Sequence, residues 1–333
     1  MGEAPIRGSH LPSPISHLPS SMNVALLCPG QGAQKVGMGQ DLADAFPDAR
    51  RTFQSVDEAL GFGLSKVMWE GPEDLLTRTD HAQPAILAHS AAVWAVVGAK
   101  LRDRVKAAAG HSLGEYSAYV AAHALSAAQG AKLVRRRGEL MHQAGTARPG
   151  TMAAVLGFDS AKVVEVCREA SAVGGVVVAA NLNEQTQTVI SGDPDAVARA
   201  GEMLKTAGAK KVIPLKVSGA FHSPLMAPAQ AGLSAALASA TMTDPGFPVV
   251  ANATAQPVRD AGTAREQLTA QLVSPVRWIE CVTQLAGLAG NPVSFVEIGP
   301  GTVLTGLAKR IAPGKSYTSL GTATEVRAFM EAA

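Results

Sequence analysis

The sequence carries little net charge, few cysteines and no long apolar run. Twenty-nine Lys and Arg residues against 27 Asp and Glu residues leave a formal charge of +2, which is too small for a general nucleic-acid-binding surface. The longest clearly apolar stretch, residues 91–97, is shorter than the ~18 residues of a membrane span. Three widely separated cysteines argue against a disulfide scaffold or a metal-binding knuckle. We therefore expect a reduced, cytoplasmic setting, with neither a membrane nor nucleic acid as partner.

The composition that remains is that of a globular α/β protein. Of 333 residues, 47% are hydrophobic and 17% are charged, which excludes a disordered chain and a charged coiled coil. Residues 1–21 hold four prolines and are expected to form a flexible arm. Strand-like runs at 24–28 and 105–109 alternate with helical stretches, among them 83–97 before the second run and 115–124 after it. Strands that alternate with helices predict a mostly parallel sheet.

The middle of the chain has a different pattern. Strand-like runs and helical stretches follow one another in the order βαββαβ, at 152–156, 160–171, 176–180, 186–190, 194–206 and 211–217. This order is typical of a ferredoxin-like unit. We therefore predict a ferredoxin-like subdomain at 148–217, inserted in a larger domain formed by 22–147 and 218–333.

A candidate nucleophile lies in the sequence GHSLG at 110–114. The pattern G-x-S-x-G marks a strained turn between a strand and a helix, and the predicted flanks supply both. Glycines are needed there because chain segments approach the turn closely. The turn would place Ser112 at a helix N-terminus, where the backbone N–H of Leu113 stabilises an oxyanion. An ordinary turn is the alternative, because the pattern is short.

A serine hydroxyl needs a base within hydrogen-bond reach, and one histidine is placed to provide it. His222 follows the predicted strand at 211–217, in a loop of small residues that ends at Pro224. Loops at the strand ends of an α/β sheet are where active sites gather. His111, next to the serine, is assigned a packing or hydrogen-bonding role. The other histidines lie in the N-terminal arm or in helical stretches with no adjacent signal: His10, His17, His81, His89, His123 and His142.

Six short motifs occur in one order along residues 23–320: PGQGAQ (29–34), GHSLGEY (110–116), RG (137–138), NLN (181–183), AFHS (220–223) and EIGPG (297–301). With them the sequence resembles the malonyl-CoA:acyl carrier protein transacylases, which load acyl groups for fatty-acid and polyketide synthesis. The resemblance implies an acyltransferase with an α/β-hydrolase-like core and a ferredoxin-like insertion. It also implies a monomer that needs no metal or redox cofactor.

The resemblance implies a ping-pong reaction with Ser112 as nucleophile and His222 as base. Ser112 would take the malonyl group from malonyl-CoA as an ester, and the phosphopantetheine thiol of acyl carrier protein would then remove it. The backbone N–H groups of Gln31 and Leu113 would bind the oxyanion, and the glycines beside Gln31 would let its loop approach the turn. The backbone carbonyl of Gln271 would orient His222.

The resemblance also assigns the substrate-binding residues. Arg137 would bind the free carboxylate of malonyl through two parallel hydrogen bonds; the alternative is a solvated helix face formed by three consecutive arginines. Because consecutive residues are ~100° apart on a helix, one of the three can point inward while the others do not. Phe221 would crowd an α-methyl group and so favour malonyl, unless it is simply a core residue. The other residues near the substrate are Gln31, His111, Asn181 and Asn183, and turn formation is an alternative explanation for the two asparagines.

One departure from the family lies at 274–278, where SPVRW replaces the usual Asn-Pro-Val before a variable residue and Trp. Two other functions stay open: a serine esterase or thioesterase that uses the same serine and histidine, and a non-catalytic scaffold for carrier proteins. The sequence does not separate a fatty-acid carrier from a polyketide carrier. Basic residues near the cleft are the candidates for docking an acidic carrier protein: Lys210, Lys211, Lys309 and Arg310.

Overall fold

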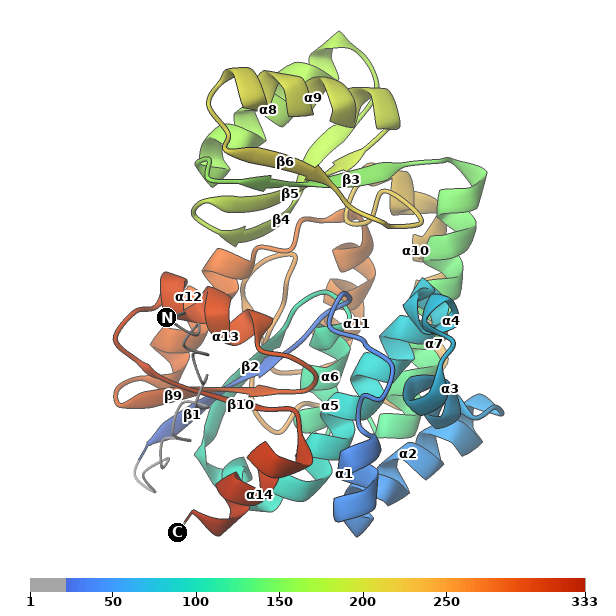
Figure 1. Ribbon diagram of the computed structural model, residues 1–333, viewed down its shortest axis with the longest axis vertical. Coiled ribbons are helices and arrows are strands. Elements are labelled where there is room, and N and C mark those ends of the chain that lie inside the picture. Colours follow the sequence, from blue (N-terminus) through green and yellow to red (C-terminus); the bar gives the residue numbers. More distant parts are fainter. Residues whose placement is uncertain (1–21, 333) are drawn as a thin grey trace, which may run out of the picture.

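The computed structural model describes residues 22–332, which form two sheets with helices around them (Figure 1). The arm expected at 1–21 lies outside the described residues. Sheet A has the strand order β10-β9-β1-β2-β7-β8, and sheet B has the order β4-β5-β3-β6. Sheet A occupies the lower part of the molecule in Figure 1 and sheet B the upper part. The protein is therefore a mixed α/β protein with two separate sheets.

Sheet A is parallel except at one edge. Its parallel strands are β1 (Asn23–Cys28), β2 (Val105–Gly110), β7 (Val249–Val250), β9 (Val293–Ile298) and β10 (Ser316–Leu320). The short edge strand β8 (Pro257–Val258) pairs antiparallel with β7. The prediction of a mostly parallel sheet is confirmed.

Helices cover both faces of sheet A. The helices of the part that contains sheet A, some of which pack on other helices, are α1 (Gln40–Ala45), α2 (Pro47–Leu60), α3 (Leu64–Glu70), α4 (Glu73–Thr77), α5 (Thr79–Leu101), α6 (Gly114–Ala121), α7 (Ala127–Ala147), α10 (Ala227–Ser239), α11 (Ala261–Ala270), α12 (Trp278–Ala289), α13 (Val303–Ile311) and α14 (Ala323–Glu331). From β1, Val24 and Leu26 pack in a core with α2, α5, α6 and α7. Ala25 and Leu27 pack in a second core with α12 and α13. Because both faces of β1 are buried, the strand reads as an unbroken apolar run.

Helix α5 is longer than the sequence predicts. The stretch at 83–97 predicts a helix, and the observed helix starts at Thr79 and ends at Leu101. Within the segment 79–104, a window of 18 residues has a mean hydropathy of 1.4 and is long and apolar enough to cross a membrane, which the short apolar run at 91–97 did not indicate. However, 78% of its apolar window is buried inside the protein, as is typical of a core helix.

Sheet B is antiparallel and carries its own core. It consists of β3 (Thr151–Leu156), β4 (Val177–Glu184), β5 (Gln187–Gly192) and β6 (Lys211–Pro214). Two helices, α8 (Ser160–Val173) and α9 (Pro194–Thr206), pack on it through a small apolar cluster. In Figure 1 these helices lie above sheet B, and the rest of the molecule lies below it. The face of sheet B without helices is thus turned toward the larger part.

Two strand ends differ from the prediction. The strand predicted at 176–180 continues to Glu184, because Asn181 pairs with β5 and also bridges to Val276. The strand predicted at 211–217 ends at Pro214. There β6 is an edge strand that pairs with β3 alone, and proline has no N–H to donate to a further ladder bond. The segment after Pro214 leads back from sheet B toward the larger part of the molecule.

Candidate active site

Ser112 lies in a tight turn between β2 and α6. A Cβ atom on Gly110 would lie 1.8 Å from the carbonyl of Gly114, and a Cβ atom on Gly114 would lie 2.2 Å from the carbonyl oxygen of Cys28. Both positions therefore require glycine, as the motif predicts. Ser112 has a φ of 53°, a left-handed conformation that is strained for a residue other than glycine. The backbone thus presents the serine in the manner expected of a nucleophile.

The side chain of Asn252 supports this turn. Its Oδ1 accepts a hydrogen bond from the backbone N–H of Ser112 at 2.7 Å, and its Nδ2 donates to the carbonyl of Gly110 at 2.8 Å. Asn252 comes shortly after β7, which neighbours β2 in sheet A. The order of the strands therefore brings to the turn a residue that is 140 positions away in the sequence.

His222 lies beside the serine in the orientation of a base. Its Nε2 is 2.8 Å from Ser112 Oγ, and its Nδ1 is 3.0 Å from the carbonyl oxygen of Gln271. Because a carbonyl only accepts hydrogen bonds, Nδ1 carries the proton and Nε2 accepts from the serine hydroxyl. Burial lowers the pKa of His222 to about 3, and the positive charge of Arg137 adds to this effect. The imidazole is therefore neutral at neutral pH and free to accept a proton.

Arg137 points from α7 into the same place and is 1% exposed. Its Nη2 donates to Ser112 Oγ at 3.0 Å and to Gln271 Oε1 at 2.9 Å, and its Nη1 donates to Gln83 Oε1 at 2.8 Å. The buried Nε donates to no described residue. A guanidinium with five N–H donors, of which these partners occupy three, keeps donors for a further acceptor. All three partners are neutral and do not balance the positive charge of the guanidinium, so the further acceptor can be an anion.

The two neighbouring arginines point elsewhere. Arg135 binds Asp80 and Glu139, whereas the more exposed Arg136 binds Glu139 alone. The helical spacing predicts this divergence, and it leaves Arg137 as the arginine of the run that faces the serine.

These groups face a cavity of about 350 Å³. Sheet B lines it with strand residues, including Met152 and Val189, and the larger part of the molecule lines it with residues from loops and helices. The residues that the sequence singled out and that line it are Gln31, His111, Ser112, Arg137, Asn181, Asn183, Phe221 and His222. Leu113 and Gln271 are buried and do not line it. Their expected contributions come from backbone groups, for which a lining side chain is not required.

The loop that carries Gln31 approaches the turn, but its two glycines serve different purposes. A Cβ atom on Gly30 would lie 2.6 Å from the carbonyl oxygen of His111, so the close approach expected here is observed. A Cβ atom on Gly32 would meet nothing within 4 Å. Gly32 instead has a φ of 102°, which disfavours any side chain. Close approach is therefore the wrong reason for the second glycine.

Asn181 and Asn183 lie within β4 and not in a turn, which corrects the alternative of turn formation. Asn183 Oδ1 is 2.8 Å from His111 Nε2, so His111 has the hydrogen-bonding role expected of it. Next to Asn181, the backbone N–H groups of Val276 and Leu182 donate to the carbonyls of Ala180 and Val276 respectively. The loop at 274–278 that departs from the family is thus joined to β4 by backbone hydrogen bonds.

Sequence reasoning missed four parts of the site: the side chains of Gln83, Glu115, Asn252 and Gln271. Glu115 stood in the quoted motif but received no role. It is fully buried and bonds to Gln271 and Asn252, not to His222, so it is not the acid of a triad. Burial raises its pKa to about 7. The sequence did offer a signal for Glu115, because a charged residue directly follows the last glycine of the G-x-S-x-G turn. Gln83 and Asn252 had no such signal.

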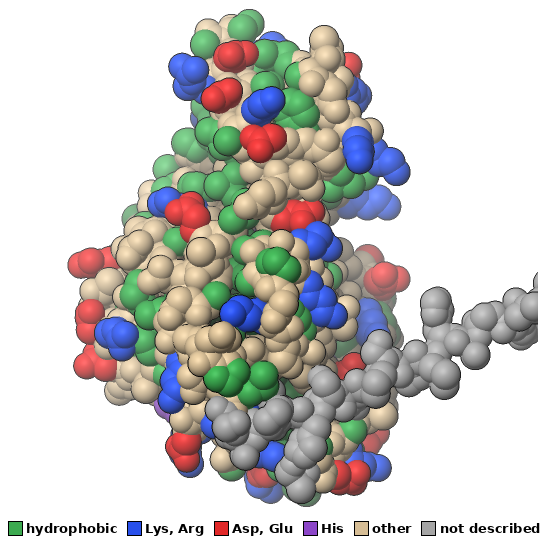
Figure 2. All heavy atoms as spheres, turned by 90° about the vertical axis from the view of Figure 1, so that its left-hand side faces the viewer, with side chains coloured by type: hydrophobic (Ala, Val, Ile, Leu, Met, Phe, Trp, Pro, Cys, Tyr) green, Lys and Arg blue, Asp and Glu red, His purple; other side chains and the backbone are tan. Residues whose placement is uncertain are grey.

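Most of the basic residues suggested for docking a carrier protein already contact other residues of this chain. Arg310 forms an ion pair with Glu184, and Lys309 lies over the ring of Tyr317. The stem of Lys210 packs where a side chain on Gly157 would be. Figure 2 shows acidic and basic side chains interspersed over one face of the molecule. Three of the four suggested residues thus contact other residues of this chain, whereas Lys211 is exposed at the start of β6.

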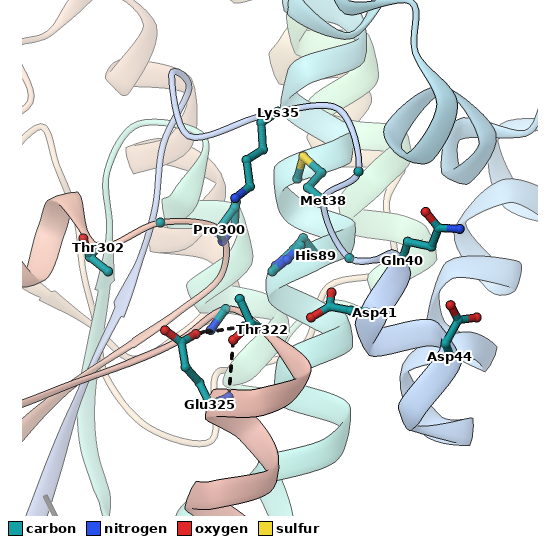
Figure 3. Close-up of a pocket in the computed structure, with 14 residues that line it drawn as sticks. Lys35, Met38, Gln40, Asp41, Asp44, His89, Pro300, Thr302, Thr322 and Glu325 are labelled. Atoms are coloured by element: carbon teal, nitrogen blue, oxygen red, sulfur yellow. Dashed lines mark hydrogen bonds between the residues drawn. The ribbon is translucent and has the colours of Figure 1, made fainter. Parts of the chain in front are cut away.

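A second cavity, of about 590 Å³, lies apart from these residues (Figure 3). It is lined by Lys35, Met38, Asp41, His89 and Pro300, among others. His89 belongs to α5 and is 2% exposed, which agrees with a core position for this histidine. None of the residues assigned to catalysis lines this cavity.

The comparisons with known proteins agree with the site. A family model described as an acyl transferase domain matches residues 25–333. The malonyl CoA-acyl carrier protein transacylase of Bacillus subtilis is 43% identical over 291 residues, which are 86% of this chain and 90% of the relative. The chain belongs to the family of malonyl CoA-acyl carrier protein transacylases, and it is an acyltransferase.

Solved structures of related proteins have the same fold. An acyl carrier protein S-malonyltransferase from Vibrio cholerae is 40% identical, with a TM-score of 0.87, over 92% of this chain and 99% of the other. A malonyl-transacylase solved in complex with its type II polyketide acyl carrier protein is 39% identical, with a TM-score of 0.87, over 93% and 100%.

Proposed function

We propose that this protein transfers the malonyl group of malonyl-CoA to the phosphopantetheine thiol of acyl carrier protein. The observation that carries the proposal is the position of Arg137, whose buried guanidinium donates to Ser112 Oγ at 3.0 Å and keeps unused N–H groups. A carboxylate is the acceptor that a buried guanidinium binds best. An acyl group on Ser112 with a carboxylate at its far end would meet that need.

In the first half of the reaction, Ser112 attacks the thioester carbonyl while His222 Nε2 takes the hydroxyl proton. The backbone N–H groups of Leu113 and Gln31 bind the oxygen that becomes negative. When the C–S bond breaks, His222 returns the proton to the CoA thiolate, and malonyl stays on the serine as an ester. The carbonyl of Gln271 holds Nδ1 throughout, which keeps Nε2 directed at the serine.

In the second half, the carrier thiol gives its proton to His222 and attacks the ester. The C–O bond breaks, His222 protonates Ser112 Oγ, and the malonyl thioester leaves on the carrier. A cavity of about 810 Å³ shares Gln31, Lys216 and Val217 with the cavity of the serine. We propose that it admits the pantetheine arm of CoA and of the carrier in turn. Phe221 lines the serine cavity and is proposed to exclude an α-methyl group.

The finer architecture belongs to the same proposal. The elements from β3 to β6 form the proposed ferredoxin-like subdomain at 148–217, and 22–147 with 218–333 form the proposed α/β-hydrolase-like domain. The separate core of sheet B supports this division. We further propose a cytoplasmic monomer that serves fatty-acid synthesis. A polyketide carrier is the alternative partner, because one structural neighbour was solved with such a carrier.

The test is transfer to carrier proteins of both kinds in their phosphopantetheine form. We expect malonyl-CoA to yield malonylated carrier, seen as a mass increase, with little free malonate when no carrier is present. Rapid release of malonate without an acceptor would identify a thioesterase instead. Transfer to a polyketide carrier alone would overturn the assignment to fatty-acid synthesis and leave the transferase reaction in place.

A further inference from the structure

Glu115 is a buried acid that the reaction above does not use. It is the second residue of α6, directly after Gly114, and is fully buried. Its Oε2 accepts two hydrogen bonds, from the backbone N–H of Asn252 at 2.9 Å and from Gln271 Nε2 at 2.7 Å. Its Oε1 has no hydrogen-bond partner among the described residues. One oxygen of the carboxylate thus makes all of its hydrogen bonds with the described residues.

The two partners of Glu115 each hold a different half of the site. Asn252 holds the backbone of the turn on both sides of the serine, at Ser112 N–H and at the carbonyl of Gly110. Gln271 holds His222 with its backbone carbonyl, and its side chain binds Arg137 and the carbonyl of Ser112. Glu115 therefore binds both supporting residues: Asn252, which holds the turn of the nucleophile, and Gln271, which holds the base and the arginine.

We propose that Glu115 is a positioning residue, whose Oε2 sets the distance between Ser112, His222 and Arg137 by binding Asn252 and Gln271 together. This inference rests on the proposed function for its consequences in malonyl transfer. In this proposal, the positioning depends on the acceptor oxygen of Glu115 and not on its negative charge. A proton on the unpartnered Oε1 would leave both hydrogen bonds to Oε2 intact.

The charge of Glu115 is free to change near neutral pH, because burial raises its pKa to about 7. The titratable or charged groups that act on it come from several elements: Arg137 on α7, Tyr116 and Tyr119 on α6, and Cys281 on α12. Of these only Arg137 is cationic, and it favours the carboxylate. A role that depended on charge would therefore appear as a step in rate around pH 7, whereas a role of position would not.

Three substitutions separate position from charge. Glu115→Gln keeps the length and the acceptor oxygen but removes the charge. Glu115→Asp keeps the charge but draws the carboxylate back by about 1.5 Å, the length of one C–C bond. Glu115→Ala removes both. Ser117→Ala is the matched control on the same helix, since Ser117 is 2% exposed and its hydroxyl has no partner among the described residues.

The measurement is the rate at which Ser112 reacts, in two ways. Intact mass follows malonyl ester formation from malonyl-CoA, and it also follows sulfonylation by phenylmethylsulfonyl fluoride, in which Oγ displaces fluoride and His222 takes the proton. We expect Glu115→Gln to stay within ~10-fold of the wild type. We expect Glu115→Asp and Glu115→Ala to lose ~100-fold in both reactions, because misplaced reacting groups cost about that much.

The pH profiles complete the test. We expect the wild type and Glu115→Gln to run parallel from pH 6 to pH 8. A step near pH 7 that only the wild type shows, or an aspartate variant faster than the glutamine variant, would overturn the proposal in favour of charge. An alanine variant as fast as the wild type would overturn it outright. If the alanine variant does not fold, the aspartate and glutamine variants still decide. A wild type that is sulfonylated but never malonylated would overturn the proposed function. The sulfonylation rates of the variants would still test the positioning role of Glu115.

Discussion

Arg137 Nη2 donates a hydrogen bond of 3.0 Å to Ser112 Oγ, the same oxygen that lies 2.8 Å from His222 Nε2. The arginine and the histidine thus meet at one atom, although they come from α7 and from the loop after β6. Burial lowers the pKa of the histidine and the charge of the arginine adds to this effect, so the histidine is neutral and accepts the serine hydroxyl proton. The serine oxygen in turn can accept a hydrogen bond from the arginine. In the proposed mechanism, the reactivity of the serine and the selection of the acyl group therefore depend on the same contact.

The first prediction concerns this arginine. Arg137→Ala should lower acylation by malonyl-CoA far more than acylation by acetyl-CoA, because only malonyl has a carboxylate for the guanidinium to bind. Lost charge-assisted hydrogen bonds of ~1.5–3 kcal/mol each correspond to a change of at least ~10-fold in the ratio of the two rates. Rates of ester formation with both thioesters measure it, with Arg136→Ala as control. An equal loss for both would show that the arginine is structural.

The second prediction concerns the loop of Gln31. Gly30→Ala would place a Cβ atom 2.6 Å from the carbonyl oxygen of His111, so the loop must move and carry the N–H of Gln31 away from the oxyanion. Loss of one such donor costs ~100-fold or more in rate. The control is Gly287→Ala on α12, where a Cβ atom would meet nothing within 4 Å. A Gly30→Ala rate close to that of the control would remove the loop from the mechanism.

The contrast between predicted and missed residues has a physical origin. Ser112 and His222 were found because each has a local signal, a glycine-bounded turn or a position after a strand. Asn252 was not found, because its contact with Ser112 depends on the order of strands in sheet A. The two asparagines of β4 have turn-forming side chains, yet pairing with β5 and with Val276 keeps them extended. Functional residues with a signal in their neighbouring sequence could be predicted, and contacts that depend on the arrangement of strands could not.

The third prediction concerns the aromatic ring beside the base. Phe221 is 6% exposed and lines the cavity of the serine. Phe221→Ser should therefore raise methylmalonyl transfer relative to malonyl transfer, by ~10-fold if the ring excludes one methyl group. Competition between the two CoA thioesters, followed by the mass of the carrier product, measures the ratio. An unchanged ratio would assign Phe221 to core packing.

The fourth prediction concerns stability in acid. Burial lowers the pKa of His89 to about 4, below the ordinary value of 6.5. As the pH falls from 6.5 toward 4, the unfolded chain takes up a proton that the folded chain does not, so acid favours unfolding. At pH 5 this residue costs ~2 kcal/mol relative to neutral pH. His89→Gln should lose less stability between pH 7 and pH 5 in urea unfolding.

The control for this experiment is His142→Gln, because His142 is exposed on α7. It should lose as much stability on acidification as the wild type. If His89→Gln also matches the wild type, then proton uptake at His89 is not part of the acid sensitivity.

The most direct measurement is the intact mass of the protein after brief exposure to malonyl-CoA without a carrier. We expect one malonyl group on the wild type and none on Ser112→Ala, with removal of the group when carrier thiol is added. A folded wild type that gains no malonyl group, or an adduct that persists in Ser112→Ala, would contradict this expectation.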